Sequence, residues 1–435
     1  MLLSPSWMRL HPYATLVLIL AVGMTIRMVC SLSPGYGFDV SVNQKWARSA
    51  AELGIAQSYK QQLDQGIPPE YPPVAQFIFA GTGHLYRLLI SRTFDYDSVS
   101  LRVFIKLPAI IADLLICLLL FMVLRTWKGV GAGLLAATAY ALHPAAIYDS
   151  AVWGQTDAIF TLFLLGAIIA WIRGRPIIAI AIYMLALLVK VQAVLLLPLF
   201  GLLLLHKPRL LLRATLISLL IFELCLIPFM IGGSVQEVLN VYAGAVGRYT
   251  NLSVGAYNFW WSLLADRSSE LTGSALLFTL LKYQTVAYSL FGFSVIMILF
   301  VCRKKLFKGS PDALFHASAL MSGAFFLLLP QMHERYMFPF VVLGLPLAFI
   351  SRRLALFYWV ASLAFFMNLV GVLPFSWIDK ALYAEFPSLD VLIAASIVWM
   401  ILLIFLEAVE RYKPFEREHA AAFEKVTHVK QRGKR

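Results

Sequence analysis

The sequence predicts an all-α polytopic membrane protein with about 12 transmembrane helices, and three observations support this prediction. Of its 435 residues, 60% are hydrophobic and only 14% are charged, and the mean hydropathy is +0.79. Soluble domains average about 25% charged residues, so a water-soluble globule is excluded. The apolar residues form runs of roughly 14 to 22 residues, close to the length of a bilayer crossing. Finally, most Lys and Arg residues lie in alternate loops between these runs.

The apolar runs define the expected helices. The first run, 13–32, is long enough for a span and has no small-residue cleavage site before Pro34, so we expect a retained helix rather than a signal peptide. The other helices are expected at 103–124, 129–148, 156–172, 176–189, 191–205, 211–231, 283–301, 312–329, 337–350, 353–372 and 388–408. Several runs are short, and 176–189 with 191–205 fits either a broken hairpin or one long tilted helix. The predicted number therefore ranges from about 10 to 13.

The distribution of basic residues predicts the orientation of the chain. With the N-terminus inside, the cytoplasmic loops and ends collect a large basic excess, whereas the opposite orientation would break the positive-inside rule. We therefore expect both termini in the cytoplasm, a single transmembrane domain over 1–408 and a basic cytoplasmic tail over 409–435. The net charge of +13 reflects this sorting and the attraction of membrane lipids, not nucleic-acid binding. The residues assigned to the cytoplasmic loops are Arg9, Arg125, Lys128, Arg173, Arg175, Lys207, Arg209, Arg213, Arg303, Lys304, Lys305, Lys308, Arg352 and Arg353.

Two predicted outer loops, about 33–102 and 232–282, are too long to be simple connectors. Loops of this length generally carry structure or function of their own. In the first loop, the apolar spacing over 42–53 suits an amphipathic helix at the membrane surface. The prolines of 68–73 then enforce an extended turn. In the second loop we expect a short helix within 234–246.

The first candidates for chemistry are Asp39 and the segment Trp153-Gly-Gln-Thr-Asp157. Asp39 follows two glycines at the outer end of the first helix, where a carboxylate could face a membrane-level cavity or simply be a solvated loop residue. Thr156 or Asp157 could cap the following helix, because their side-chain oxygens satisfy free backbone amides. Capping does not account for the Trp-Gly-Gln that precedes them.

Several ionisable residues lie in or beside the apolar runs. Lys190, with Gln192, is at the outer end of one expected helix, against the sorting of cations elsewhere. It could snorkel to the interface or pair with a phosphate or carboxylate. Asp113 and Glu223 lie deep inside expected spans, where ionisable groups are functional or paired. Lys106 is seven residues before Asp113 on the same helix face, so we expect these two to form a structural pair.

A cluster of three ionisable residues follows Pro330. His333, Glu334 and Arg335, with Tyr336, fall within one turn at the outer membrane surface, where such groups are costly unless they meet each other or a polar ligand. Pairing of Glu334 with Arg335 is one interpretation. The other is an anion site in which Arg335 and His333 contact a phosphate.

Taken together and in order, these motifs resemble the GT-C superfamily of integral-membrane glycosyltransferases. They resemble especially the bacterial and archaeal mannosyltransferase-like proteins related to the GPI-anchor mannosyltransferases and the dolichyl-phosphate-glucose glucosyltransferases. The resemblance covers about residues 13 to 372. One departure is the single acid at Asp39, where some relatives have a pair. The resemblance rests on these motifs: Asp39 before Trp46-Ala47, Glu70-Tyr-Pro-Pro73, Trp153-Gly-Gln-Thr-Asp157, Lys190-x-Gln192, Tyr257-Asn-Phe-Trp260 and His333-Glu-Arg-Tyr-Met-Phe-Pro339.

The resemblance implies an inverting glycosyltransferase with its active site on the extracytoplasmic face. The donor would be a polyprenyl-phosphate-linked hexose, with mannose favoured and glucose next, and the acceptor a lipid-linked molecule, a glycan or a protein. Asp39 would be the general base, and Arg335, His333 and Lys190 would neutralise the leaving phosphate. It further implies a multi-pass protein of a prokaryotic plasma membrane.

The remaining implied roles belong to the donor pocket. Glu334, Gln192, Asp157 and Gln155 would join the donor-binding set. No metal ligands are assigned, because no dense His, Asp or Glu set has metal-binding spacing, but some relatives use a divalent cation, so that cofactor stays open. The residues expected to form the pocket wall are Tyr71, Trp153, Tyr257, Asn258, Trp260 and Tyr336.

Another class of function fits the same composition. A multi-pass secondary transporter or a lipid or oligosaccharide flippase would also combine about twelve helices with intramembrane charges. Transporters commonly contain matching repeats, and no such repeat is evident in this sequence. The long first outer loop, with its acid at Asp39 and its Pro-Pro turns, favours an enzyme. A non-catalytic lipid-binding scaffold is a third reading.

Overall fold

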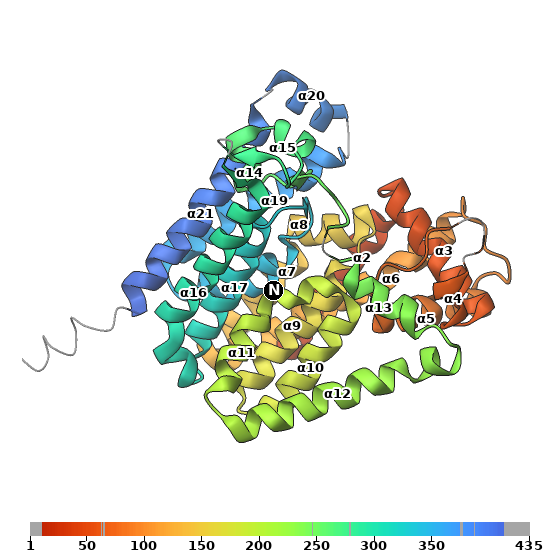
Figure 1. Cartoon of the computed structure of the whole chain (residues 1–435), viewed down its shortest axis with the longest axis horizontal. Helices are drawn as coiled ribbons and strands as arrows, with labels where there is room; N and C mark the ends of the chain where they lie inside the picture. Colours follow the sequence, from red (N-terminus) through yellow and green to blue (C-terminus); the bar gives the residue numbers. More distant parts are fainter. Residues whose placement is uncertain are drawn as a thin grey trace, which may run out of the picture.

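The computed structural model describes residues 11–61, 63, 66–245, 247–277, 280–374, 377–386 and 388–412, and within them the chain is almost wholly helical (Figure 1). Seven described helices are long and apolar enough to cross a membrane. The fold is therefore that of a multi-pass helical membrane protein. Most of the predicted tail, from residue 413 on, lies outside the described residues. The seven helices are α2 (Pro12–Ser31), α6 (Val99–Lys128), α12 (Pro208–Ile231), α16 (Tyr283–Phe307), α17 (Pro311–Leu328), α19 (Arg352–Val372) and α21 (Leu389–Tyr412).

The helix predicted at 129–148 is broken in the structure. It consists of α7 (Val130–Ala141), a short α8 (Pro144–Ile147) and a π-helix η2 (Tyr148–Trp153), with a bend of 47°. Pro144 causes the break, because proline lacks a backbone N–H and disfavours helical geometry in the residue before it. This bent pair is the eighth candidate span among the described residues.

Four more apolar helices are shorter than a bilayer crossing. For example, the 16 residues of α9 rise about 24 Å, less than the roughly 30 Å of a hydrocarbon core. All four match predicted apolar runs, but whether each one spans stays a prediction, as does the total of 12. They are α9 (Asp157–Ile172), α10 (Pro176–Val189), η3 with α11 (Val191–Leu196 and Leu197–Leu205) and α18 with η4 (Phe338–Gly344 and Leu345–Phe349).

The first outer loop is more helical than its sequence suggests. The expected amphipathic helix is α3 (Gly37–Leu53), and it begins five residues earlier than predicted. After a single turn, α4 (Gln57–Lys60), the loop contains α5 (Pro73–Leu89), which the sequence reading missed. The two longer helices pack tightly, because Gly83 lies against the Ala47 carbonyl with no room for a Cβ. Trp46 fills the space beside them and stacks edge-on against Phe79 at 5.5 Å.

The second outer loop contains the expected short helix, α13 (Val235–Ala243), and two small helices, α14 (Phe259–Leu264) and α15 (Arg267–Glu270). Strand β1 (Ser253–Val254) pairs in parallel with β4 (Met332–His333). The short β2 (Leu276–Leu277) and β3 (Leu281–Lys282) form an antiparallel pair before α16. A further helix, α20 (Trp377–Glu385), precedes α21. The β1–β4 pairing joins the second outer loop to the 333–336 cluster.

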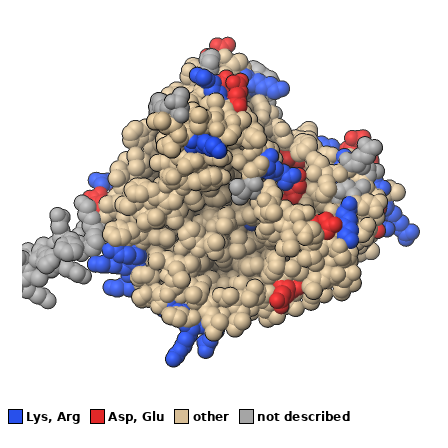
Figure 2. Space-filling model, in the orientation of Figure 1, with Lys and Arg blue, Asp and Glu red and all other residues tan. Residues whose placement is uncertain are grey.

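Charged side chains lie around the rim of the view in Figure 2. Lys and Arg are seen at the left and lower edges, where α16 and α21 end in Figure 1, and also at the top and on the right, so the sorting of basic residues stays a prediction. A broad, mostly uncharged surface crosses the centre of the same view. The helices of the two outer loops, α3 to α5 and α13 to α15, lie on the right, in the centre and at the top.

Two buried cations, Arg27 and Lys106, hold the N-terminal helices together, and the predicted pair of Lys106 with Asp113 is wrong. Asp113 does not pair with Lys106; its Oδ2 lies 2.8 Å from Arg27 Nε, and its Oδ1 accepts a 2.7 Å bond from the Tyr140 hydroxyl. The Lys106 ammonium donates instead to the carbonyls of Ser31, Ser33, Ala151 and Val152 at 2.9–3.2 Å. Asp113 thus pairs with Arg27 from another helix and not with Lys106, which is seven residues away on its own helix. Lys106 thereby ties the end of α2 to the end of η2.

Glu223, the other acid placed inside an expected span, lies within α12, and its side chain is exposed on the protein surface.

Candidate functional site

A cavity of about 270 Å³ lies where the first outer loop meets the segments that follow η2, α10 and α17. Six of the residues singled out from the sequence line it: Asp39, Tyr71, Gln155, Gln192, Arg335 and Tyr336. Apolar side chains supply much of the rest of the wall, including Val42, Val194, Phe325 and Leu329. A cavity with apolar walls and a few convergent polar groups is typical of a ligand site.

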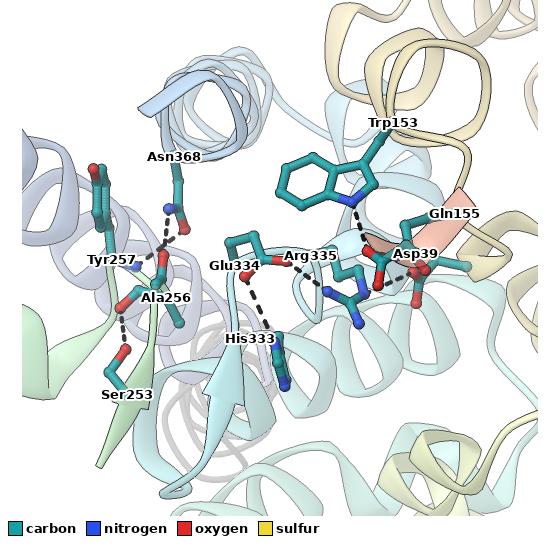
Figure 3. A network of polar contacts seen from close by, with 12 residues as sticks. Asp39, Trp153, Gln155, Ser253, Ala256, Tyr257, His333, Glu334, Arg335 and Asn368 are labelled. Carbon is teal, nitrogen blue, oxygen red and sulfur yellow. Dashed lines mark hydrogen bonds and ion pairs between the residues drawn. The ribbon is translucent and has the colours of Figure 1, made fainter. Parts of the chain in front are cut away.

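Asp39 is held in the first turn of α3 by contacts with the end of η2. Its Oδ2 accepts a hydrogen bond from Trp153 Nε1 at 2.9 Å and another from Gln155 Nε2 (Figure 3). The backbone brings the two segments together, since the Tyr36 N–H donates to the Trp153 carbonyl at 3.1 Å. Both side-chain bonds end on Oδ2, which leaves Oδ1 available to a ligand hydroxyl.

Gly35 makes this approach possible. Its φ of +74° is in the left-handed region, and a Cβ at this position would lie 2.6 Å from the Trp153 carbonyl oxygen. Only glycine accommodates both the dihedral angle and the contact. Gly154, with φ of +92°, turns the chain between Trp153 and Gln155 so that both side chains reach Asp39.

Arg335 lies between Glu334 and Asp39 (Figure 3). Its Nη1 is 2.6 Å from Glu334 Oε1, and its Nε is 3.8 Å from Asp157 Oδ2. The Glu334–Arg335 pairing considered from the sequence is therefore present. Because the guanidinium has five N–H donors in a planar fork, these contacts still leave donors for a ligand in the cavity.

Lys190 lies behind the cavity wall. Its side chain is 1% exposed, and its Nζ is 2.8 Å from Asp157 Oδ1, so its partner is a carboxylate. The ammonium lies 5.2 Å from the Tyr71 ring centroid and 5.8 Å from that of Tyr336, the two rings that line the cavity. Lys190 therefore does not contact the cavity itself. It holds Asp157 in place and packs against the two tyrosines that line the cavity. Asp157 is buried with it and does not line the cavity.

His333 and Glu334 are buried beside Arg335 rather than on the cavity surface. His333 Nδ1 is 3.7 Å from Glu334 Oε2, and its ring packs against Tyr249 at 4.6 Å. Burial and the Arg335 charge lower the pKa of His333, so its ring is neutral near pH 7. Burial alone would raise the pKa of Glu334, but Arg335 and His333 outweigh burial and lower it to about 2. Glu334 is therefore ionised and compensates Arg335.

The aromatic cluster of the second outer loop is not part of the cavity. Figure 3 places Tyr257 on the far side of Glu334 from Asp39, where its backbone N–H donates to Asn368 Oδ1. Asn258 caps α14 by accepting from the backbone N–H groups of Trp260 and Trp261. Trp260 Nε1 donates to the Leu328 carbonyl. These contacts make Tyr257, Asn258 and Trp260 supports of the β1–β4 junction, while Trp153 stands behind Asp39.

One expected local interaction is wrong. Thr156 is the residue before α9, but no side-chain cap bond is formed there, and its Oγ1 is buried without a hydrogen-bond partner among the described residues. Asp157 does not cap either, because it is the first residue of the helix and its carboxylate turns to Lys190 and Arg335. The ion pairs outcompete the local cap, since they compensate buried charges.

Two charged residues of the cavity were not assigned from the sequence. Arg248 and Glu70 both line it and form an ion pair with each other. Glu70 stands in a quoted motif but was given no role, and Arg248 belongs to none. The available signal for Arg248 was its position, because it is a cation in a loop predicted to lie outside.

The described residues contain no group of three or more His, Cys, Asp or Glu side chains placed to hold a metal ion. Comparison with protein-family models and with curated protein sequences finds no match to this chain. The chemistry of the site therefore has to be argued from its own geometry.

Proposed function

We propose that this protein is an inverting glycosyltransferase that uses a polyprenyl-phosphate-linked hexose, mannose before glucose, as its donor. The observation that carries the proposal is that Asp39 and Arg335 line one cavity with a largely apolar wall. A carboxylate with an available oxygen suits the activation of a hydroxyl. A guanidinium suits a phosphate, because its donors match two phosphate oxygens. The likeness of the motifs to the GT-C superfamily supports the same assignment.

The proposed reaction is a single displacement at the anomeric carbon. Asp39 Oδ1 accepts the proton of the acceptor hydroxyl as the oxygen bonds to C1. The bond between C1 and the phosphate oxygen breaks at the same time, and polyprenyl phosphate leaves with the electron pair, so the configuration at C1 inverts. Arg335 stabilises the charge that develops on the phosphate, a kind of interaction that is commonly the largest catalytic contribution.

The supporting residues have consistent roles in this scheme. Trp153 and Gln155 orient the base by holding Oδ2. Glu334, Asp157 and Lys190 fix Arg335 in place as a compensated ion-pair network. The apolar wall would contact the first isoprene units. The acceptor, whether lipid-linked, glycan or protein, would react on the extracytoplasmic face.

A transfer assay tests the proposal. Purified protein in nanodiscs would be given polyprenyl-phosphate mannose or glucose with candidate acceptors, and the anomer of the product determined by NMR. Asp39→Asn should lower kcat by about 10²- to 10⁴-fold. Asp97→Asn, at an exposed position of the same loop, is the matched control and should retain activity. Full activity of Asp39→Asn would remove the assigned base.

A transporter or flippase is the second candidate, and one observation favours it. The Lys190–Asp157 pair is buried at the break between α10 and η3, and broken helices with buried charges are common in transporters. Proteoliposomes distinguish the two functions. Movement of a polyprenyl-phosphate sugar between leaflets, with no cleavage of its C1–O bond, would support transport.

A further inference from the structure

A second cavity, of about 580 Å³, adjoins the first one in the outer loops. It lies between α13 on one side and Tyr59 with residues 67–70 on the other, and its walls include Glu237 and Asn240. Three residues line both cavities: Glu70, Val241 and Arg248. The Glu70–Arg248 ion pair therefore stands at the border between the two spaces.

The second cavity differs chemically from the first. Among the described residues, its charged lining consists of Glu70, Glu237 and Arg248, and this one cation is paired with Glu70. Formal charge is thus negative overall, which disfavours a phosphate or another anion. Tyr59, Ile67, Val241 and two prolines form its apolar side.

The polar groups on this wall include both acceptors and donors. Asn240 Oδ1 already accepts a 3.0 Å hydrogen bond from Gln236 Nε2, so Asn240 offers its amide N–H groups to a ligand. Glu237 Oε2 is buried and has no hydrogen-bond partner among the described residues. The Asn240 amide and the backbone of Gly244 and Gly247 lie along the same wall. Carboxylate oxygens accept hydrogen bonds from hydroxyl groups and amide N–H groups donate to them, and a buried acceptor without a donor is costly unless a ligand supplies one.

We propose that this second cavity is the acceptor subsite and that it binds an uncharged saccharide through Glu237 and Asn240. The proposal rests on the proposed function, and it assigns the donor to the first cavity and the acceptor to the second. The saccharide hydroxyl would pass the Glu70–Arg248 pair to reach Asp39. The cavity volume is within the range of small-molecule sites, roughly 300 to 1,000 Å³.

Two variants test the assignment in the full-length protein in nanodiscs. Asn240→Trp fills the cavity, and Leu239→Trp, at the neighbouring exposed position of α13 that lines neither cavity, is its control. Each is assayed for transfer from polyprenyl-phosphate mannose to methyl α-mannoside and for transfer to water. We expect Asn240→Trp to raise the acceptor KM at least about tenfold relative to Leu239→Trp, and to lower transfer more than hydrolysis. Glu237→Gln should raise the acceptor KM about three- to tenfold, the size of one hydrogen bond.

Saccharide binding without donor separates this proposal from the proposed function. Saturation-transfer NMR would compare methyl α-mannoside with the methyl glycoside of glucuronic acid, and we expect binding of the neutral sugar that Asn240→Trp abolishes. If the wild-type protein binds the sugar in this way but neither transfers nor hydrolyses, the subsite stands and the transferase proposal fails. If it transfers, and Asn240→Trp changes transfer and hydrolysis equally or changes neither, the subsite proposal fails alone. Preference for the glucuronide would also overturn it.

Discussion

Asp39 accepts a 2.9 Å hydrogen bond from the indole nitrogen of Trp153, a residue 114 positions further along the chain. This bond joins the first outer loop to the end of η2, and it fixes which oxygen of the carboxylate stays available. The orientation of the proposed base, Asp39, therefore depends on this hydrogen bond.

Replacing Trp153 with Phe should lower kcat about tenfold and leave the donor KM nearly unchanged. Phe keeps most of the buried ring but removes the N–H that holds Asp39 Oδ2. Steady-state kinetics with a polyprenyl-phosphate sugar measure the effect. Trp399→Phe, at an exposed position on α21, is the control. An unchanged kcat would show that Gln155 alone suffices to orient the carboxylate.

Gly35→Ala should destabilise the protein by about 1–3 kcal/mol and reduce activity further than its loss of folded protein explains. The new Cβ would meet the Trp153 carbonyl oxygen at 2.6 Å and Val40 Cγ2 at 2.9 Å, which forces α3 away from η2. Gly54→Ala separates the two causes, because Gly54 also has a positive φ, +87°, but nothing within 4 Å of a Cβ. Thermal unfolding in detergent and specific activity are the measurements. Equal activity losses in both variants would mean that the dihedral angle, and not the contact with Trp153, matters.

Acid should weaken the wild-type fold more than that of Glu334→Gln. The pKa of Glu334 is lowered to about 2 in the folded protein, so its ion pair stabilises the fold above its unfolded pKa, about 4.3. This stabilisation is lost as the pH falls from about 4.3 towards 2. The melting temperature measured at pH 7, 4.5 and 3 should therefore fall more steeply for the wild type. Glu385→Gln, at an exposed position on α20, should follow the wild-type curve.

The Glu70–Arg248 pair should matter for donor binding and little for stability. Both side chains are partly exposed, and such pairs contribute at most about 1 kcal/mol. Arg248 and Arg335 both line the cavity, so Arg248 is a second cation that could meet the donor phosphate there. Arg248→Ala should raise the donor KM several-fold, and Glu70→Gln should lower it by releasing the guanidinium. Opposite signs in the two variants, with melting temperatures near that of the wild type, are the expected result; a shared loss of stability would contradict it.

The apolar helices could be predicted because each one has a local sequence signal: a continuous apolar run with residues at its ends that begin or end a helix. The predicted boundaries 176–189 coincide with α10, where Pro176 begins the helix and Lys190 follows its end. The break at Pro144 was foreseeable from the same rules, and the length of the apolar run concealed it. Helix α5 was missed because it lies in a segment predicted to be a loop. It is held by packing against α3, a tertiary contact that the local sequence does not show.

The candidate site was predictable in its members and less so in their pairings. Asp39, Gln155, Gln192 and Arg335 do meet at one cavity, as the order and outer location of the motifs suggested. Which cation meets which acid depends on the distance between helices, and sequence spacing carries no such information. Lys190 therefore pairs with Asp157, and the cluster around Tyr257 packs elsewhere for the same reason.

The four carbonyl contacts of Lys106 have a consequence for the order in which the protein is made. Every group that anchors Asp39, from α2 to Gln155, lies before residue 156 of the 435, whereas Arg248 and Arg335 come much later. During synthesis, the part of the site that contains Asp39 can thus form before Arg248 and Arg335 have been translated. If the chain is divided after α12, one fragment contains Asp39 and the other contains Arg248 and Arg335. We expect co-expression of the two fragments to restore activity.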